Sequence, residues 1–171
     1  AVAISKGPGS YTGLRIGTST AKGLCYALDI PLIAVPTLQA MAYGCSNNYE
    51  FNKDALFCPM IDARRMEVYS AFYSKDNHLV RDTQADIINE SSYLNYLSDS
   101  KIVFFGDGSA KCKEMFSSNA NALFIDGFHP SAQYLSLIAM VKFNAQQLED
   151  TAYFEPYYLK DFVAGKPKKL V

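Results

Sequence analysis

Hydrophobic and polar positions follow two different periods along this chain and predict alternating strands and helices. Short apolar runs bounded by glycine, proline or polar residues indicate buried strands. We expect strands at residues 1–5, 30–35, 55–62, 66–73, 78–86, 101–105 and 122–125. We expect helices at residues 10–28, 37–44, 91–97 and 109–116, and from Pro130 onward. Because strands and helices alternate except in an antiparallel meander over residues 55–86, the sequence predicts an α/β fold with a mixed sheet.

The helix expected at residues 10–28 carries small residues at every fourth position, namely Gly13, Gly17 and Ala21. Residues spaced in this way share one face of a helix. Each glycine inside a helix costs about 1 kcal/mol relative to alanine, so a compensating interaction is expected. The close approach of another helix along this small-residue stripe is the interaction that we predict.

The helix expected after Pro130 has apolar residues at three- and four-residue steps. These residues are Tyr134, Ile138, Val141, Ala145 and Leu148. The spacing is typical of an amphipathic helix, and we expect this face to pack against a core.

A polar segment at residues 45–54 marks the expected boundary between two lobes. We therefore expect the remnant of a first lobe at residues 1–44 (strand, helix, strand, helix), a second α/β lobe at residues 45–150 and a C-terminal tail at residues 151–171. The chain opens inside an apolar strand, without a preceding turn. A core strand needs neighbours on its backbone groups, so we expect the first lobe to be incomplete in this chain.

Composition and charge narrow the possible function classes. The 171 residues are 49% hydrophobic and 19% charged, which is typical of a globular protein rather than a disordered one. The net charge of −1 gives no general attraction to nucleic acid or to anionic membranes. No apolar run reaches the roughly 18 residues that span a bilayer. The four cysteines form no CxxC pair, so we expect reduced thiols in the cytoplasm.

The sequence lacks the residue patterns of the common catalytic sites. The turn at residues 7–10 precedes a helix, which is a weak phosphate-binding signal, because the Gly-Lys-Ser/Thr ending of a phosphate loop is missing. His78 and His129 are far apart and belong to no HxxxH pair, and no serine lies in a Gly-x-Ser-x-Gly turn. We therefore predict no catalytic residue, no metal site and no cofactor.

Two charged clusters have a structural and a functional interpretation. Asp62 with Arg64 and Arg65 is expected to form an Asp–Arg pair that stabilises a hairpin; the alternative is a surface pair that contacts a partner. The lysines at positions 166, 168 and 169 follow several aromatic residues. They are expected to be a solvated end, with docking or nucleic-acid stacking as the alternative.

Three stretches of the sequence, in order and spread over nearly the whole chain, resemble a single family. The first, from Gly7 to Thr37, begins GPGSYTGLRIGTSTAKGL; the second, residues 61–69, reads IDARRMEVY; the third, residues 155–160, reads EPYYLK. All three are similar to the signature of the bacterial TsaB (YeaZ) family. Its members are accessory subunits of the machinery that makes N6-threonylcarbamoyladenosine (t6A) in tRNA.

The resemblance implies an actin/Hsp70-like fold (ASKHA, ribonuclease-H-like) of two lobes, with a further β-meander and helix before the GPGS stretch. It also implies a set of structural signature residues, namely Gly7, Gly9, Asp62, Arg64, Arg65 and Tyr69. The family was formerly grouped with glycoproteases (peptidase M22), because its catalytic relative TsaD shares the fold. TsaD-like proteins carry an HxxxH metal motif that this sequence lacks, so the resemblance implies no enzyme activity for this chain alone.

The resemblance further implies protein partners. First-lobe helices of this family pair with equivalent helices of TsaD, or with a second copy, as a helical bundle. The partner-binding residues would be Gly13, Arg15, Gly17, Ala21 and Lys22. The small residues would allow close approach of the partner helix, and Arg15 and Lys22 would lie at the edge of the interface. A TsaE-like ATPase would be a third partner, and tRNA would be bound only through the complex.

Two other functions stay open at this point. One is an ASKHA-type hydrolase or phosphotransferase, a glycoprotease-like enzyme that would turn over ATP or peptide. The other is a binding protein in cell-wall or protease pathways, which would capture its partner independently of TsaD.

Overall fold

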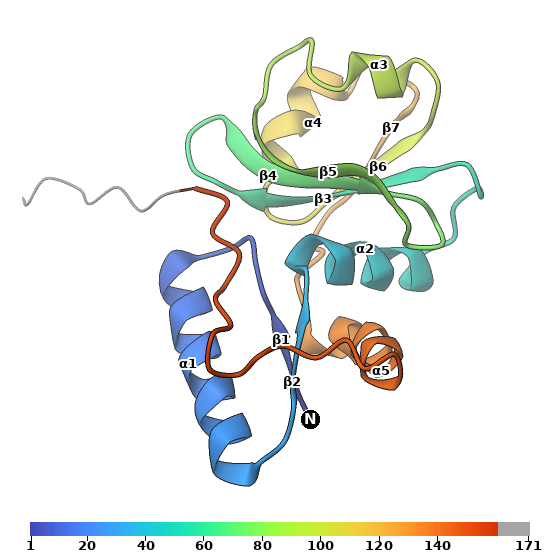
Figure 1. Ribbon diagram of the computed structural model, residues 1–171. Helices are drawn as coiled ribbons and strands as arrows, with labels where there is room; N and C mark the ends of the chain where they lie inside the picture. Colours follow the sequence, from blue (N-terminus) through green and yellow to red (C-terminus); the bar gives the residue numbers. More distant parts are fainter. Residues whose placement is uncertain (161–171) are drawn as a thin grey trace, which may run out of the picture.

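Two separate β-sheets organise the chain, which the computed structural model describes from residue 1 to residue 160 (Figure 1). The strands are β1 (Val2–Ser5), β2 (Leu32–Val35), β3 (Leu56–Asp62), β4 (Glu67–Tyr73), β5 (Leu79–Ile87), β6 (Ile102–Phe105) and β7 (Ala122–Ile125). The helices are α1 (Tyr11–Leu28), α2 (Thr37–Asn48), α3 (Leu94–Leu97), α4 (Ala110–Phe116) and α5 (Ser136–Asn144), with a 3₁₀ turn η1 (Ala132–Leu135) before α5. The α/β class and the mixed sheet are as the sequence predicts.

The smaller sheet pairs β1 with β2 in parallel and lies between two helices (Figure 1). Side chains alternate between its faces. On the face toward α1, Leu32 and Ala34 pack against Ala21 and Cys25 of the helix. The opposite face packs Ile33 and Val35 against residues of η1 and α5. Glu149 pairs with Leu32 on the outer edge of β2.

The larger sheet has the order β5-β4-β3-β6-β7. Strands β3, β4 and β5 form the expected antiparallel meander, whereas β6 and β7 continue the sheet in parallel from β3. Helix α2 covers one face, and α3 and α4 lie on the other (Figure 1). Phenylalanine side chains fill both layers, with Phe57 and Phe105 under α2 and Phe72 and Phe104 under α4.

The packing of two helices differs from the lobe ranges expected from the sequence. Helix α2 runs to Asn48, into the polar segment at residues 45–54, and packs on β3 of the larger sheet. Helix α5 falls within residues 45–150 but packs on β2 of the smaller sheet. Each helix therefore packs on the sheet of the other expected lobe. Local composition does not indicate such contacts, because they join residues that are far apart in the sequence.

The face of α5 that packs inward is only partly the predicted one. Tyr134 and Ile138 contact the core as expected, but Val141 is 69% exposed and the buried residues are Leu135 and Ala139. The helix ends at Asn144, so the later predicted positions lie outside it. The inward positions keep the three- and four-residue spacing, but they run through Leu135, Ala139 and Lys142, so the face is rotated by about one residue from the predicted one.

All four cysteines, at positions 25, 45, 58 and 112, are free thiols buried in the core. Burial raises the pKa of Cys45 and of Cys112 to about 12. These thiols therefore behave as small hydrophobic side chains. Within residues 1–160, no helix combines the length and the apolar character that crossing a bilayer needs.

Candidate functional site

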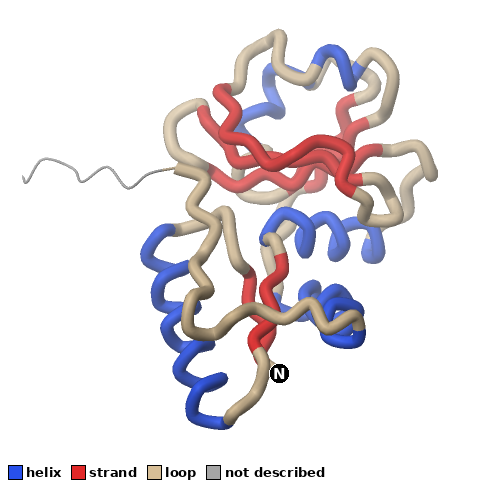
Figure 2. Tube along the Cα trace, viewed as in Figure 1, coloured by secondary structure: helices blue, strands red, loops and turns tan. Residues whose placement is uncertain are grey.

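The three stretches that carry the family resemblance meet at one groove of about 520 Å³. Its walls are the loop before α1, the β3–β4 hairpin and the C-terminal segment at residues 157–160. Figure 2 shows this segment running as a loop beside α1 toward the larger sheet. Of the signature residues, Gly9, Asp62, Arg64 and Tyr69 line the groove, so tertiary folding joins positions that are far apart in sequence.

The loop before α1 is fixed to α2 and to the C-terminal segment. Gly7 has a φ of +111°, and a Cβ at this position would lie 2.6 Å from the carbonyl oxygen of Tyr157. The backbone N–H of Gly7 donates to Oγ1 of Thr37 over 3.1 Å, and the N–H of Tyr157 donates to the carbonyl of Lys6 over 2.7 Å. The hydroxyl of Thr37 thus holds this loop instead of capping its own helix.

Asp62 pairs with a lysine and not with its neighbouring arginines. Its Oδ1 accepts a hydrogen bond from Nζ of Lys111 over 2.6 Å and another from the backbone N–H of Arg64 over 2.5 Å. The hydrogen bond from Lys111 holds the pKa of Asp62 below its usual value. The predicted Asp–Arg side-chain pair is therefore wrong, because α4 brings Lys111 to the carboxylate, while Arg64 contributes its backbone N–H and the field of its charge.

Arg64 and Arg65 occupy the tip of the β3–β4 hairpin in a left-handed conformation. Their φ angles are 71° and 51°. Three residues separate Ala63 from Glu67, and the backbone N–H of Glu67 donates to the carbonyl of Arg64 over 3.2 Å. Positive φ favours asparagine and glycine, and each other residue there costs about 1 kcal/mol or more. Both side chains are exposed. Within residues 1–160, neither guanidinium group has a hydrogen bond or an ion pair.

The other charged groups of the groove are largely engaged with one another. Lys160 forms an ion pair with Glu67, and a carboxylate oxygen of Asp107 accepts the backbone N–H of Asp62 over 3.0 Å. The ring of Tyr11 lies 5.1 Å from that of Tyr158, centroid to centroid. In the part of the chain that the structure describes, no three acidic, histidine or cysteine side chains are grouped to hold a metal ion.

The structure divides the predicted partner-binding residues between two sides of α1. Gly13 and Arg15 are exposed. Gly17 faces β1, since a Cβ there would lie 3.9 Å from Cδ1 of Ile4, and Ala21 is only 5% exposed. Lys22 donates from Nζ to the carbonyls of Ala152 and Phe154 over 2.9 and 3.1 Å. Gly17, Ala21 and Lys22 are therefore turned toward the rest of their own chain, and Gly13 and Arg15 are the two of the five that stay exposed.

The outward face of α1 contains one predicted partner-binding residue, Gly13, and five residues that were not predicted. It consists of Gly13, Ile16, Thr20, Gly23, Leu24 and Ala27, all of them exposed and none of them charged. Ile16 is 64% and Leu24 46% exposed. The three- and four-residue spacing of these positions was a visible signal, but the buried side of the helix has the same spacing. Only the packing against β1 distinguishes the two faces.

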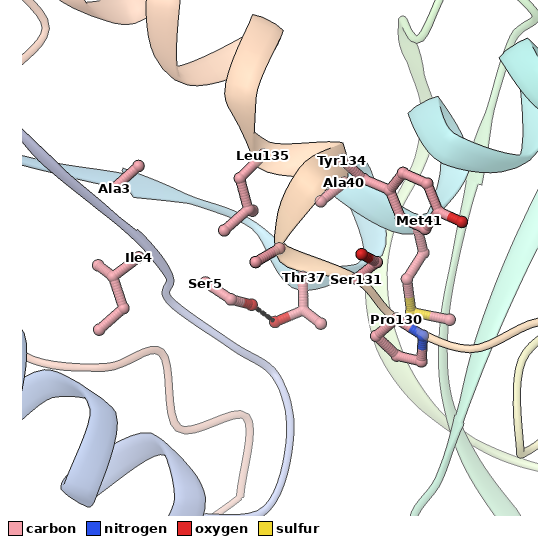
Figure 3. A pocket seen from close by; sticks show the side chains of 11 residues that line it. Ala3, Ile4, Ser5, Thr37, Ala40, Met41, Pro130, Ser131, Tyr134 and Leu135 are labelled. Atoms are coloured by element: carbon pink, nitrogen blue, oxygen red, sulfur yellow. Dashed lines mark hydrogen bonds between the residues drawn. The ribbon is translucent and has the colours of Figure 1, made fainter.

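A smaller cavity of about 300 Å³ lies between β1 and η1, and Figure 3 shows the side chains around it. Its lining is mainly aliphatic, with Ile4, Ala40 and Leu135 among the contributing residues. The hydroxyl groups of Ser5 and Thr37 are hydrogen-bonded to each other over 2.6 Å. Its polar side chains are hydroxyl groups, and no carboxylate, amine, imidazole or thiol of the described residues lines it.

Comparison with known proteins gives consistent matches. Residues 1–167 match the family described as "TsaD: tRNA N6-adenosine threonylcarbamoyltransferase". A Bacillus subtilis protein named "tRNA threonylcarbamoyladenosine biosynthesis protein TsaB" is 38% identical over 117 residues, which cover 67% of this chain and 49% of the relative. The Escherichia coli protein of the same name is 32% identical over 175 residues, which cover 97% of this chain and 73% of the relative. The chain thus spans about half of the first relative and about three quarters of the second.

Solved structures show the same fold. A Pseudomonas aeruginosa protein described as similar to peptidase YEAZ superposes with a TM-score of 0.76 at 22% identity, covering 92% of this chain and 72% of that chain. A structure described as YeaZ from the same organism gives a TM-score of 0.71 over the same 92% of this chain and 73% of its own. The expected actin/Hsp70-like α/β fold is therefore confirmed.

Proposed function

Because this chain belongs to the TsaB (YeaZ) family, we propose that it acts in the biosynthesis of t6A in tRNA as a non-catalytic subunit. In this proposal it binds a TsaD-type catalytic subunit and thereby activates it. The observation that carries the proposal is the outward face of α1, an exposed helix surface without a charged residue.

The outward face of α1 has the composition of a helix–helix interface. Gly13 and Gly23 allow a second helix to approach closely, and nothing lies within 4 Å of a Cβ placed at Gly23. Ile16 and Leu24 supply apolar area that is exposed in the single chain. Burying such area contributes roughly 25 cal/mol per Å². Arg15 lies beside this face, its guanidinium 5.2 Å from the ring centroid of Tyr11, where it can serve as a rim residue.

The chemistry of the groove also favours a binding role. Two of its charged side chains form ion pairs within the chain, Asp62 with Lys111 and Lys160 with Glu67. Such groups maintain the geometry of the loops around the groove. A subunit of this kind can still control a reaction rate, because binding one conformation of its partner more tightly shifts the partner toward that conformation.

The proposal includes the other members of the assembly. A TsaE-type ATPase would be a third subunit, and tRNA would be bound through the complex. In the absence of the catalytic subunit, the uncharged face could accept a second copy of this chain, since it presents no like charges to itself. The assembly would work in the cytoplasm.

The proposal is tested by mixing this chain with the TsaD-type subunit of the same organism and measuring the mass of the complex by size exclusion with light scattering. Ile16→Glu places a charge in the middle of the outward face and is expected to weaken binding by about thirtyfold or more, the effect of a central interface residue. The degree to which this variant stimulates t6A formation by the catalytic subunit should fall together with its binding affinity.

The matched control is Val141→Glu, which changes an equally exposed apolar residue on α5. We expect this variant to bind as the wild type does. If the wild-type chain does not bind the catalytic subunit, or if the purified chain alone turns over ATP or peptide, the proposal is wrong.

A further inference from the structure

The C-terminal segment is attached firmly along its first part, residues 149–157. Phe154 buries its ring in the core beside α1 and β2. Lys22 of α1 donates two hydrogen bonds to carbonyl groups of the segment. The backbone N–H of Tyr157 donates to the carbonyl of Lys6 over 2.7 Å. Buried apolar area and backbone hydrogen bonds therefore hold this part against the smaller sheet and its helix.

The end of the segment, residues 158–160, is attached in a different way. It forms no backbone hydrogen bond with the described part of the chain, and the hydrophobic clusters of the described core do not include it. The ring of Tyr158 lies 5.1 Å from that of Tyr11. Lys160 forms an ion pair with Glu67, the first residue of β4. This ion pair ties the end of the segment to the larger sheet.

The Lys160–Glu67 pair is of a kind that opens readily. The side chain of Lys160 is 43% exposed and that of Glu67 is 19% exposed. Water and salt screen such a pair, so it contributes little to stability. The Arg81–Asp86 pair on the same sheet is more buried, and further hydrogen bonds to the carboxylate support it. In the described chain, the carboxylate of Glu67 has no such second donor.

We infer that residues 158–160 are a latch on the groove. When the Lys160–Glu67 pair is formed, they close the wall between the loop before α1 and the β3–β4 hairpin (Figure 2). When the pair breaks, they move away from β4 and widen the groove. Tyr157 is the hinge, because its N–H stays bonded to Lys6 and its carbonyl oxygen packs against Gly7. The inference concerns this chain alone and does not rest on the proposed function.

The test places a fluorescent reporter on the latch. The sequence contains no tryptophan, so Tyr158→Trp introduces a single one. Acrylamide should quench its emission weakly at low salt and about twofold more strongly at ~1 M NaCl, where the ion pair is screened. Adding Glu67→Gln should give the stronger quenching at every salt concentration. The reversed pair Glu67→Lys/Lys160→Glu should restore the protection at low salt, because the attraction is restored.

Asp126→Asn in the reporter chain is the matched control. It removes the Lys113–Asp126 pair, which is also exposed but lies away from the groove, and it should leave the quenching unchanged. If Glu67→Gln leaves the quenching and its salt dependence as they were, the ion pair is not a latch and the inference is wrong. The same conclusion follows if the reversed pair does not restore the protection.

A second measurement needs no reporter. In the chain that carries only Glu67→Gln, chymotrypsin should cut after Tyr158 and Leu159 several times faster than in the wild type, because the freed end fits the protease. The bond after Phe154 should stay as resistant as in the wild type, since that part remains attached. Faster cleavage after Phe154 would show that the whole segment detaches, and the hinge at Tyr157 would be wrong. Equal cleavage after Tyr158 in both chains would overturn the latch.

Discussion

At Gly7 the chain has no room for a side chain. The backbone adopts a φ of +111°, and the carbonyl oxygen of Tyr157 lies only 2.6 Å from the position that a Cβ would take. The close approach is needed because the loop before α1 and the C-terminal segment share a backbone hydrogen bond at Lys6. Gly23 is a contrasting case, because it lies in the middle of a helix with no atom near a Cβ. Its flexibility has no structural use within this chain.

We predict opposite effects for the same substitution at these two positions. Gly7→Ala should lower the free energy of unfolding by about 2–3 kcal/mol, through the unfavourable φ and the clash with Tyr157. Gly23→Ala should raise it by about 0.5–1 kcal/mol, because alanine favours the helix. Urea denaturation of both variants beside the wild type measures the difference. Equal effects at the two positions would contradict the steric argument.

At the scale of elements, a polar cluster joins β4, β5 and the turn before α3. Arg81 forms an ion pair of 2.6 Å with Asp86, and Oδ2 of the same carboxylate accepts from Ser70 over 2.5 Å and from Tyr93 over 2.8 Å. Burial would raise the pKa of Asp86, but the hydrogen bonds from Arg81, Ser70 and Tyr93 outweigh it and hold the pKa below the usual value. The guanidinium also lies 5.4 Å from the ring centroids of Phe72 and Tyr93.

The lowered pKa of Asp86 makes the stability of this sheet region depend on pH. The folded state binds the proton more weakly than the unfolded state, so the stabilisation is present above about pH 4 and is lost as the pH falls through the folded-state pKa. Asp86→Asn should therefore lower the free energy of unfolding by about 3 kcal/mol at pH 7. At acid pH, the variant and the wild type should differ less in their free energy of unfolding. Denaturant unfolding at several pH values measures this dependence. Asp82→Asn, an exposed position on the same strand, should show no comparable loss.

At the scale of the whole molecule, the C-terminal segment connects the two sheets. Phe154 is buried against the residues shared by α1 and β2, and Lys22 binds the segment's carbonyls. Lys160 at its far end forms an ion pair with Glu67 of β4. Figure 1 shows the segment crossing from α5 along α1 to the larger sheet. It therefore forms one wall of the groove and holds the loop before α1 in place.

We expect the anchor of this segment to be Phe154. Phe154→Ala should cost about 3–4 kcal/mol, as the truncation of a buried phenylalanine usually does, and should expose residues 150–160 to limited proteolysis. Tyr153→Ala is the control at the adjacent position, where the side chain is 84% exposed, and it should change stability by no more than about 0.5 kcal/mol. Equal protease resistance of the two variants would show that the segment is held by other contacts.

The candidate site was only partly visible in the sequence. Gly9, Asp62, Arg64 and Tyr69 were selected by the family resemblance, and they do line one groove. The partner of Asp62 was missed, because Lys111 is 49 residues away and no local pattern links the two. Of the outward face of α1 only Gly13 was predicted, since Ile16 and Leu24 became distinguishable from the buried side only once β1 lay against Gly17. The lysines at positions 166, 168 and 169 lie outside the described residues.

The sequence by itself determined the kind and order of the elements, the α/β class and the family. Strands and helices were predictable because period, capping and turn residues act within a few positions of the chain. Tertiary structure alone decided that α2 packs on β3, that α5 packs on β2 and that Lys22 binds the C-terminal segment. These contacts join residues that are distant in sequence. Which of several apolar faces finds which sheet depends on the packing of the whole chain.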